Sequence, residues 1–195
     1  VPRLHRHLLL AEAMVLEAHQ RGEIWACAVR PDVIYGRRDR QFVPRIGKVI
    51  ARGFFPLLGG GRSTLAIVHA GNVADGAVRA IGTDIAGGKA YNLANDYDVT
   101  VREFVRLAAQ GLGRRVVLVP VPMILAKTVL KLMTILIGVA RRGAGLSQAG
   151  GAVASVSRSN PFSSDRATRE LGWAPPVRPG VGIPEAFRWW ADQRA

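Results

Sequence analysis

Two short, almost uninterrupted apolar runs, IWACAVR at 24–30 and AYNLA at 90–94, most constrain what this chain can fold into. Each has the length of a strand, and neither alternates between apolar and polar residues. Strands of this kind are buried on both faces, as in a parallel sheet covered by helices. Because two strands do not make a stable sheet alone, the pattern predicts that strands from outside these 195 residues complete it.

Helical segments alternate with the apolar runs. Residues 8–20 are rich in Ala, Leu, Met and Glu and end before Gly22, and residues 42–53 carry apolar side chains at helical spacing. A third strand is expected over 65–69, followed by a helix over 72–82 with Asn72 as its N-cap. This alternation predicts an α/β fold with parallel strands.

The second half of the chain carries further helix signals. Thr100 and Glu103 form a capping box that predicts a helix to about residue 110. Residues 163–173 (SSDRATRELGW) predict a short helix with Ser164 as its cap and Gly172 as its end. Residues 182–193 predict a closing amphipathic helix.

The most apolar stretch lies at 116–140 and is long enough to resemble a membrane span. Pro120 and Pro122 break its start, and Lys127 and Lys131 lie on one helical face of the remainder. Since two such charges are costly near the centre of a bilayer, we expect residues 121–140 to form a buried or interfacial amphipathic helix. Such a helix could make a peripheral membrane contact.

The net charge of +13 raises the question of an anionic partner. The excess is arginine, scattered in pairs such as Arg114-Arg115, without a long basic run or aromatics interleaved for base stacking. A nucleic-acid partner is therefore not favoured, and an arginine-rich coding bias explains the charge. A basic binding protein for nucleic acid or an anionic membrane surface is kept as the alternative function.

The single cysteine, Cys27, cannot form an internal disulfide, and the sequence has no Cys/His spacing suited to zinc. No metal site is expected. His5, Arg6 and His7 interrupt any apolar leader at the start. These features predict a cytoplasmic protein, with membrane association through 121–140.

Five segments, in this order, resemble the later half of the extended short-chain dehydrogenase/reductases, and most of all their 3β-hydroxysteroid dehydrogenase-like branch. The family includes NAD-dependent epimerases and dehydratases. The resemblance implies a partial NAD(P)-binding Rossmann fold, with the later strands and helices only, and a C-terminal mixed α/β substrate domain. Residues 1–94 would be the Rossmann part with an inserted substrate-side segment at 37–70, and residues 95–195 the substrate domain. The five segments are LLAEAMVLEA, CAVRPDVIYGRRDRQFVPRI, GGGRSTLAIVHAGNVADGAVRAI, GGKAYNLANDYDVTVREFV and FSSDRATRELGWAPP.

The resemblance implies hydride transfer to or from a nicotinamide ring, with proton transfer by a Tyr in a Tyr-x-x-x-Lys motif. Counting along the matching helix, these two residues should stand where the chain has Leu4 and Leu8. The glycine-rich dinucleotide motif is also missing, and Gly59–Gly61 precedes a strand, so it is interpreted as a turn. We therefore assign no catalytic residue, and expect a truncated or split oxidoreductase that is inactive alone. The other interpretation is a piece of an active full-length enzyme, in keeping with Val1 in place of Met.

The resemblance also implies the walls of the binding site. Pro31, Val33 and Ile34 follow the first buried run and would contact the nicotinamide of NAD or NADP. The substrate, a small molecule of sterol-like or sugar-nucleotide type, would be contacted by Arg40, Gln41, Phe42 and Arg62. A sheet completed from outside implies a complementing N-terminal half or a homo-oligomer as partner. His69 and Asn72 are interpreted as structural residues.

Overall fold

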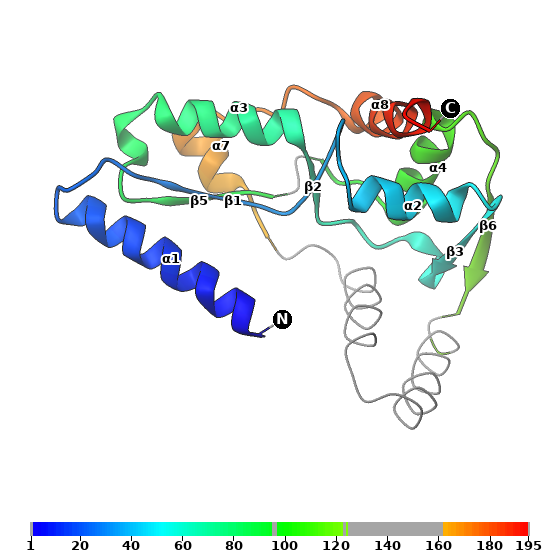
Figure 1. Ribbon diagram of the computed structural model, residues 1–195, viewed down its shortest axis with the longest axis horizontal. Helices are drawn as coiled ribbons and strands as arrows, with labels where there is room; N and C mark the ends of the chain where they lie inside the picture. Colours follow the sequence, from blue (N-terminus) through cyan, green and yellow to red (C-terminus); the bar gives the residue numbers. More distant parts are fainter. Residues whose placement is uncertain (1, 95–96, 123, 125–161, 195) are drawn as a thin grey trace. The chain divides into compact units, whose positions relative to one another are not determined.

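The computed structural model describes residues 2–94, 97–122, 124 and 162–194, and the chain in it divides into two compact units (Figure 1). Unit 1 comprises residues 1–34, 67–96 and 162–177. Unit 2 comprises residues 35–66, 97–161 and 178–195. Both units are therefore assembled from segments that are far apart in the sequence.

A parallel strand pair lies at the centre of unit 1. Strand β1 (Ala28–Pro31) pairs with β5 (Ala90–Leu93), and Pro31 lies opposite Leu93 at their carboxyl ends. This confirms that the two apolar runs belong to one parallel sheet, although both strands are shorter than the runs. A second pair joins β2 (Val33–Tyr35) to β4 (Ile67–His69). Strand β2 directly follows the first apolar run, in a stretch for which the sequence pattern predicted no strand.

The helices of unit 1 lie on both sides of the β1–β5 pair (Figure 1). Helices α3 (Ala70–Ile81) and α7 (Asp165–Leu171) lie on one side, and α1 (Pro2–Gln20) lies on the other. A short 3₁₀ turn, η2 (Asp84–Ala86), follows α3. The buried core is formed between the sheet and α3 and α7 by Val68, Ala80, Tyr91, Leu93, Ala167, Leu171 and Trp173.

The start of α3 differs from the prediction. The helix begins at Ala70, and the Nδ1 atom of His69 accepts a hydrogen bond from the N–H of Gly71 at 3.1 Å. His69, and not Asn72, is therefore the N-cap. Asn72 lies inside the helix and is fully buried. Its side-chain amide donates to the carbonyl of Val177 at 2.9 Å, and its Oδ1 accepts from the N–H of Val177 at 2.8 Å.

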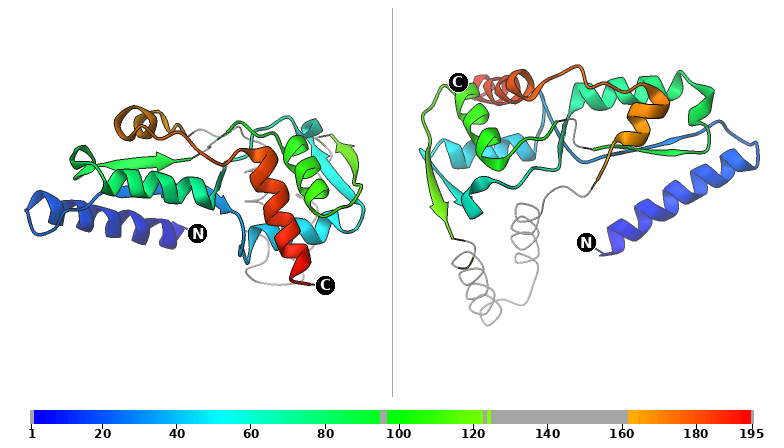
Figure 2. Two further views of the ribbon diagram at one scale, coloured as in Figure 1. Left: turned by 90° about the horizontal axis from the view of Figure 1, so that it is seen from above. Right: turned by 180° about the vertical axis from the view of Figure 1, so that it is seen from behind.

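Unit 2 is built on α4 (Val101–Gly111), which lies beside α8 (Pro179–Asp192) and α2 (Phe42–Ile50) (Figure 2). Helix α8 begins three residues earlier than predicted. Thr100 is the N-cap of α4, and its hydroxyl accepts from the N–H of Glu103 at 3.2 Å, as the capping box predicted. Four rings pack together in the core, those of Tyr35, Phe42, Phe104 and Phe187, with centroids 5.5–6.5 Å apart.

A second parallel pair, which the sequence pattern did not predict, lies in unit 2. Strand β3 (Phe54–Leu58) pairs with β6 (Val117–Val121), with Phe54 opposite Val117. The turn predicted at Gly59–Gly61 is a 3₁₀ turn, η1. The helix predicted over 121–140 lies almost wholly outside the described residues. Within the described residues, no helix has the length and apolarity needed to cross a membrane.

Helix α7 ends at Gly172 as predicted, in the left-handed conformation (φ +60°) that favours glycine. Its predicted cap, Ser164, makes no capping bond to the helix. The hydroxyl of Ser164 instead accepts from the N–H of Ala94 at 3.1 Å and donates to the carbonyl of the same residue. The N–H of Asp165 is bound by Ser163 at 3.0 Å. Ser164 therefore ties α7 to the end of β5.

We expect Asn72→Ala to lower the free energy of unfolding by about 3 kcal/mol, because it leaves both backbone groups of Val177 without their partner in a buried place. Urea unfolding followed by circular dichroism measures this. Asn92→Ala is the matched control, since Asn92 donates one long bond of 3.4 Å to Ser163, and should cost less than about 1 kcal/mol. Equal losses in the two variants would contradict the role assigned to Asn72.

Candidate functional site

The carboxyl end of the β1–β5 pair is the first candidate site, because ligands of parallel α/β sheets bind beyond this edge. Pro31 is the last residue of β1 and is exposed. Val33 and Ile34 follow, and 48% and 43% of their surfaces are exposed. Their apolar side chains are thus not packed into the core, and they are accessible to a flat apolar group. The structure brings these three predicted residues together at one edge.

Helix α1 is held against β1 by an ion pair. The guanidinium of Arg30 donates two hydrogen bonds to the carboxylate of Glu12, one of them of 2.9 Å from Nε to Oε2. These bonds lower the pKa of the Glu12 carboxyl and raise that of Arg30. The helix extends over positions 4 and 8, one turn apart. It therefore has the geometry for a Tyr-x-x-x-Lys pair, with Leu4 and Leu8 at those positions.

Asp39 lies next to the predicted substrate-side residues, and the sequence pattern missed it. Its carboxylate accepts from the N–H groups of Gln41 (2.7 Å), Phe42 (3.0 Å) and Val43 (2.9 Å). It thereby neutralises the positive end of α2. Arg38 precedes it in the left-handed region, at φ +66°. An aspartate three residues before a helix start is a usable signal for such a cap.

The four predicted substrate-side residues have different environments. Arg40 and Gln41 are exposed just before α2, whereas Arg62 is exposed on another segment, after η1. Phe42 is half-buried, and its ring packs on Phe104 with centroids 5.5 Å apart. It therefore contributes to the core of unit 2. The part of the chain that the structure describes contains no group of three His, Cys, Asp or Glu side chains placed to hold a metal ion.

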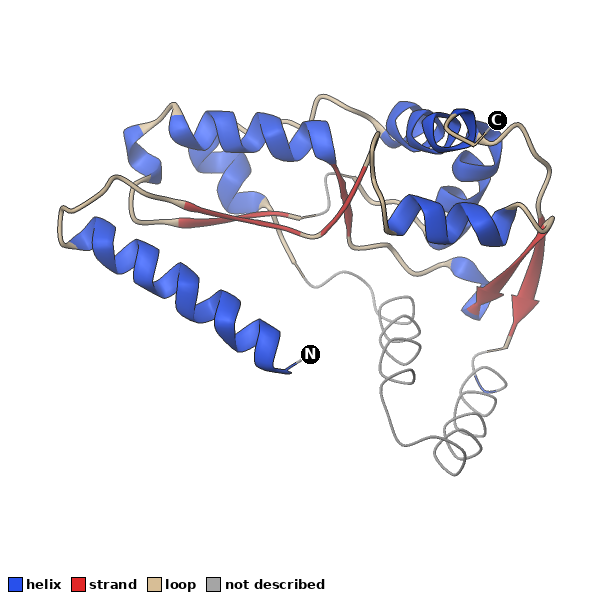
Figure 3. Ribbon diagram, viewed as in Figure 1, coloured by secondary structure: helices blue, strands red, loops and turns tan. Residues whose placement is uncertain are grey.

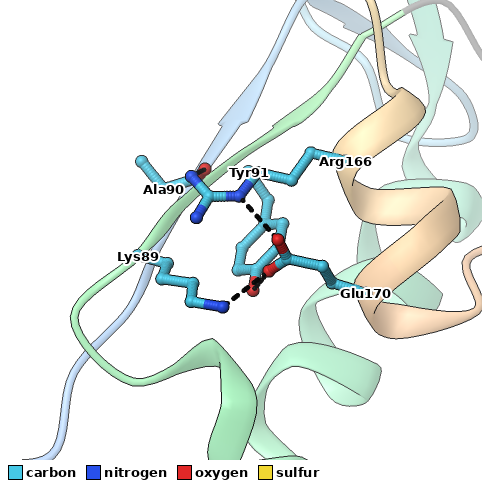
Figure 4. A network of polar contacts seen from close by, with 5 residues as sticks. All are labelled: Lys89, Ala90, Tyr91, Arg166 and Glu170. Carbon is cyan, nitrogen blue, oxygen red and sulfur yellow. Dashed lines mark hydrogen bonds and ion pairs between the residues drawn. The ribbon is translucent and has the colours of Figure 1, made fainter.

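A dense polar cluster joins α7 to β5 (Figure 4). The carboxylate of Glu170 accepts from Nζ of Lys89 at 2.9 Å, the hydroxyl of Tyr91 at 2.7 Å and Nε of Arg166 at 3.2 Å. Arg166 also lies over the Tyr91 ring, 5.2 Å from its centroid, and donates to the carbonyl of Ala90 at 3.3 Å. Both carboxylate oxygens are thus occupied by donors on the described residues.

The cluster shifts two pKa values strongly. Hydrogen bonds from Lys89, Tyr91 and Arg166 lower the pKa of Glu170 to about 2. Burial of the phenol, together with its bond to the carboxylate, raises the pKa of Tyr91 to about 12. A phenol held neutral in this way is a poor acid or base near pH 7. The cluster is therefore a structural tie that fixes α7 on the sheet.

The tie predicts a pH dependence of stability. Because the pKa of Glu170 is lower in the folded state, its contribution is present above about pH 4.5 and is lost as the pH falls towards 2. Glu170→Gln should flatten the stability curve in that window and lower stability at neutral pH. Thermal unfolding between pH 2 and 7 measures it, with the exposed Glu103→Gln as the control. The assignment is wrong if both variants keep the acid slope of the unmodified chain.

Comparisons with known proteins give a consistent result. The model of the 3-beta hydroxysteroid dehydrogenase/isomerase family matches residues 4–119. The human short-chain dehydrogenase/reductase family 42E member 1 is 36% identical over 117 residues, covering 53% of this chain. A 3beta-hydroxysteroid-dehydrogenase/decarboxylase, isoform 3, from Arabidopsis thaliana is 25% identical over 187 residues, covering 93% of it.

The fold is similar to that of solved structures as well. The structure of RMD from Pseudomonas aeruginosa complexed with NADPH superposes with a TM-score of 0.63 at 15% identity, covering 94% of this chain and 54% of that one. This likeness supports the predicted Rossmann-type α/β fold. The matches cover only 30% and 33% of the human and Arabidopsis relatives. The chain thus spans about a third of the length of these relatives.

Proposed function

Because the chain belongs to the 3-beta hydroxysteroid dehydrogenase/isomerase family, we propose that it forms part of an NAD(P)-dependent oxidoreductase. The enzyme would act on a hydroxyl or keto group of an apolar, sterol-like substrate. Membership confirms the predicted resemblance to the extended short-chain dehydrogenase/reductases, and the matched residues 4–119 include four of the five segments. The observation that carries the proposal is the exposed apolar edge at the carboxyl end of β1, formed by Val33 and Ile34.

The cofactor side fits a nicotinamide ring in part. Pro31, Val33 and Ile34 offer a flat apolar wall at the edge of a parallel sheet, where such rings bind. The 195 residues contain no G-x-G-x-x-G motif to receive a pyrophosphate. The RMD structure, which is similar in fold, is complexed with NADPH. We therefore assign NAD or NADP as the cofactor. Pro31, Val33 and Ile34 would contact its nicotinamide ring, and we assign no residue of this chain to its pyrophosphate.

The substrate side favours an apolar molecule over a sugar nucleotide. The N–H groups at the start of α2 are already bound by Asp39, so a diphosphate there would compete with a carboxylate. Arg37, next to this place, is paired with Glu185 at 3.6 Å. Two comparisons also support this choice, since the matching family is named for hydroxysteroids and the Arabidopsis relative is named a 3beta-hydroxysteroid-dehydrogenase/decarboxylase.

The chain's own residues would bind and orient rather than transfer a proton. When bound, the nicotinamide supplies or accepts the hydride at the substrate carbon. Val33 and Ile34 would exclude water from the ring face. Leu4 and Leu8 have no ionisable group, so neither can give or take the proton of the reacting hydroxyl. We therefore propose that the chain, as it stands, does not catalyse the oxidoreduction by itself.

The proposal predicts no turnover by the purified chain. With NADH or NADPH and a 3-oxosteroid, the cofactor absorbance should fall no faster than in buffer, because no residue at position 4 or 8 can move a proton. Calorimetry with either cofactor should show no saturable heat. Turnover by the purified chain would contradict the proposal that it is inactive. If the double variant Val33→Asp with Ile34→Asp abolished that turnover, the result would still support the nicotinamide site assigned to these two residues. The matched control is Val78→Asp with Ile81→Asp, two exposed residues of α3.

The substrate class has its own test. Equilibrium dialysis should show saturable binding of a radiolabelled 3β-hydroxysteroid and none of UDP-glucose, because the donors at the start of α2 are taken. Arg40→Ser with Arg62→Ser should leave steroid affinity within about twofold, since a neutral substrate does not require them. Binding of UDP-glucose that disappears in this variant would establish the sugar-nucleotide class instead. Arg106→Ser with Arg188→Ser controls for the change in net charge.

A further inference from the structure

The net positive charge of this chain is confined to one of its two units, although both contain basic residues. Unit 2 contains 19 of the 27 Lys and Arg residues but only five of the 14 Asp and Glu residues, a net charge of +14. Unit 1 contains eight basic and nine acidic residues, a net charge of −1. A coding bias towards arginine would affect both units alike. The charge therefore calls for an explanation in terms of what unit 2 contacts.

Unit 2 contains the β3–β6 strand pair, drawn in red in Figure 3. The exposures of its side chains show that one face of the pair is apolar. Paired residues of parallel strands point to the same face, and the pairs Phe54–Val117 and Pro56–Val119 share one. Half of the Phe54 surface, 66% of Val117 and 42% of Val119 are exposed, and Pro56 is exposed too. On the opposite face Leu57 is buried, whereas Phe55 and Leu118 are half-buried. The outer face is thus apolar, and the described residues leave it exposed.

Arginines flank this face at the end where both strands begin. Arg52 lies two residues before Phe54, and Arg115 lies two residues before Val117. The N–H of Val117 donates to the carbonyl of Gly53 at 2.9 Å, which holds the two strand starts together. Arg52, Arg114 and Arg115 are all exposed, and none has a carboxylate partner among the described ion pairs. Cationic side chains therefore border the apolar face.

We propose that the outer face of the β3–β6 pair docks on an anionic phospholipid membrane surface. In this arrangement Phe54, Val117 and Val119 enter the boundary between headgroups and acyl chains, and Arg52, Arg114 and Arg115 bind lipid phosphates above it. The contact is peripheral and involves no membrane-spanning segment. It uses described residues of unit 2 only, and it does not depend on the proposed oxidoreductase role.

Two other occupants fit these observations less well. A nucleic acid would satisfy the arginines, but single strands are bound by stacking on aromatic rings, and the face has one ring among aliphatic neighbours. A second copy of the chain would cover the apolar residues, but it would bring two units of +14 together. A lipid surface offers an anionic layer of headgroups for the arginines and, beneath it, an apolar layer of acyl chains for Phe54, Val117 and Val119.

The experiment is co-sedimentation of the full chain with vesicles of equimolar phosphatidylcholine and phosphatidylglycerol, and with phosphatidylcholine vesicles alone. We expect binding to the anionic vesicles that weakens with salt, and little to the others. Arg114→Ser with Arg115→Ser should lower the partition coefficient about 25-fold, since each cation at such a surface contributes roughly fivefold. Val117→Asp with Val119→Asp should lower it by at least about tenfold.

The controls separate the face from general charge and from misfolding. Arg178→Ser with Arg188→Ser removes the same charge at and on α8, and should lower binding less than about threefold. Val117 and Val119 are exposed, as are the substituted arginines. The midpoint of thermal unfolding should therefore be unchanged in every variant. Equal loss in the α8 variant would overturn the proposal, as would full vesicle binding by the Val117/Val119 variant. An oligonucleotide bound more tightly than the vesicles would assign the arginines to nucleic acid and also overturn it.

Discussion

The parallel pairing of β1 with β5 is the constraint on which the rest of this structure depends. Parallel neighbours cannot be joined by a tight turn, so the chain must leave the sheet after Pro31 and return at Ala90 from the other end. That crossover contains α3, whose Asn72 and Gly76 lie against the core. It also contains the excursion that forms the first part of unit 2. The candidate site lies at the carboxyl edge because both strands end there.

Features governed by neighbouring residues could be predicted from the sequence. The parallel pairing of the two apolar runs, the Thr100 cap and the Gly172 helix end follow from sequence patterns, and the structure confirms them. The burial predicted for the first run is not confirmed, because Ala28 and Val29 are half-buried and Arg30 and Pro31 are exposed. The role of Asn72 could not be predicted, because its partner Val177 is 105 residues away. Strand β6 was hidden because its residues merge with the longer apolar stretch that follows.

In the candidate site, too, local features could be predicted from the sequence and long-range contacts could not. Val33 and Ile34 follow the first apolar run directly and their side chains are exposed, but their contact with a nicotinamide stays a prediction. Phe42 was predicted to face substrate, and its ring contacts Phe104 because α2 packs on α4, which sequence spacing does not reveal. The basic charge looked scattered because the segments of the two units alternate along the chain. If both proposals hold, a membrane-docked unit would meet a sterol-like substrate where such molecules dissolve.

The alternation of segments also determines the order in which the chain can fold during synthesis. The backbone passes between the two units five times, and the last segment of unit 1 ends at residue 177. Trp173 and Val177 complete the core around Asn72, so unit 1 stays open until residue 177 has left the ribosome. During that interval Leu93 and Tyr91 lack their cover from α7. Chaperones that bind exposed apolar segments of nascent chains therefore have a long opportunity to act on this protein.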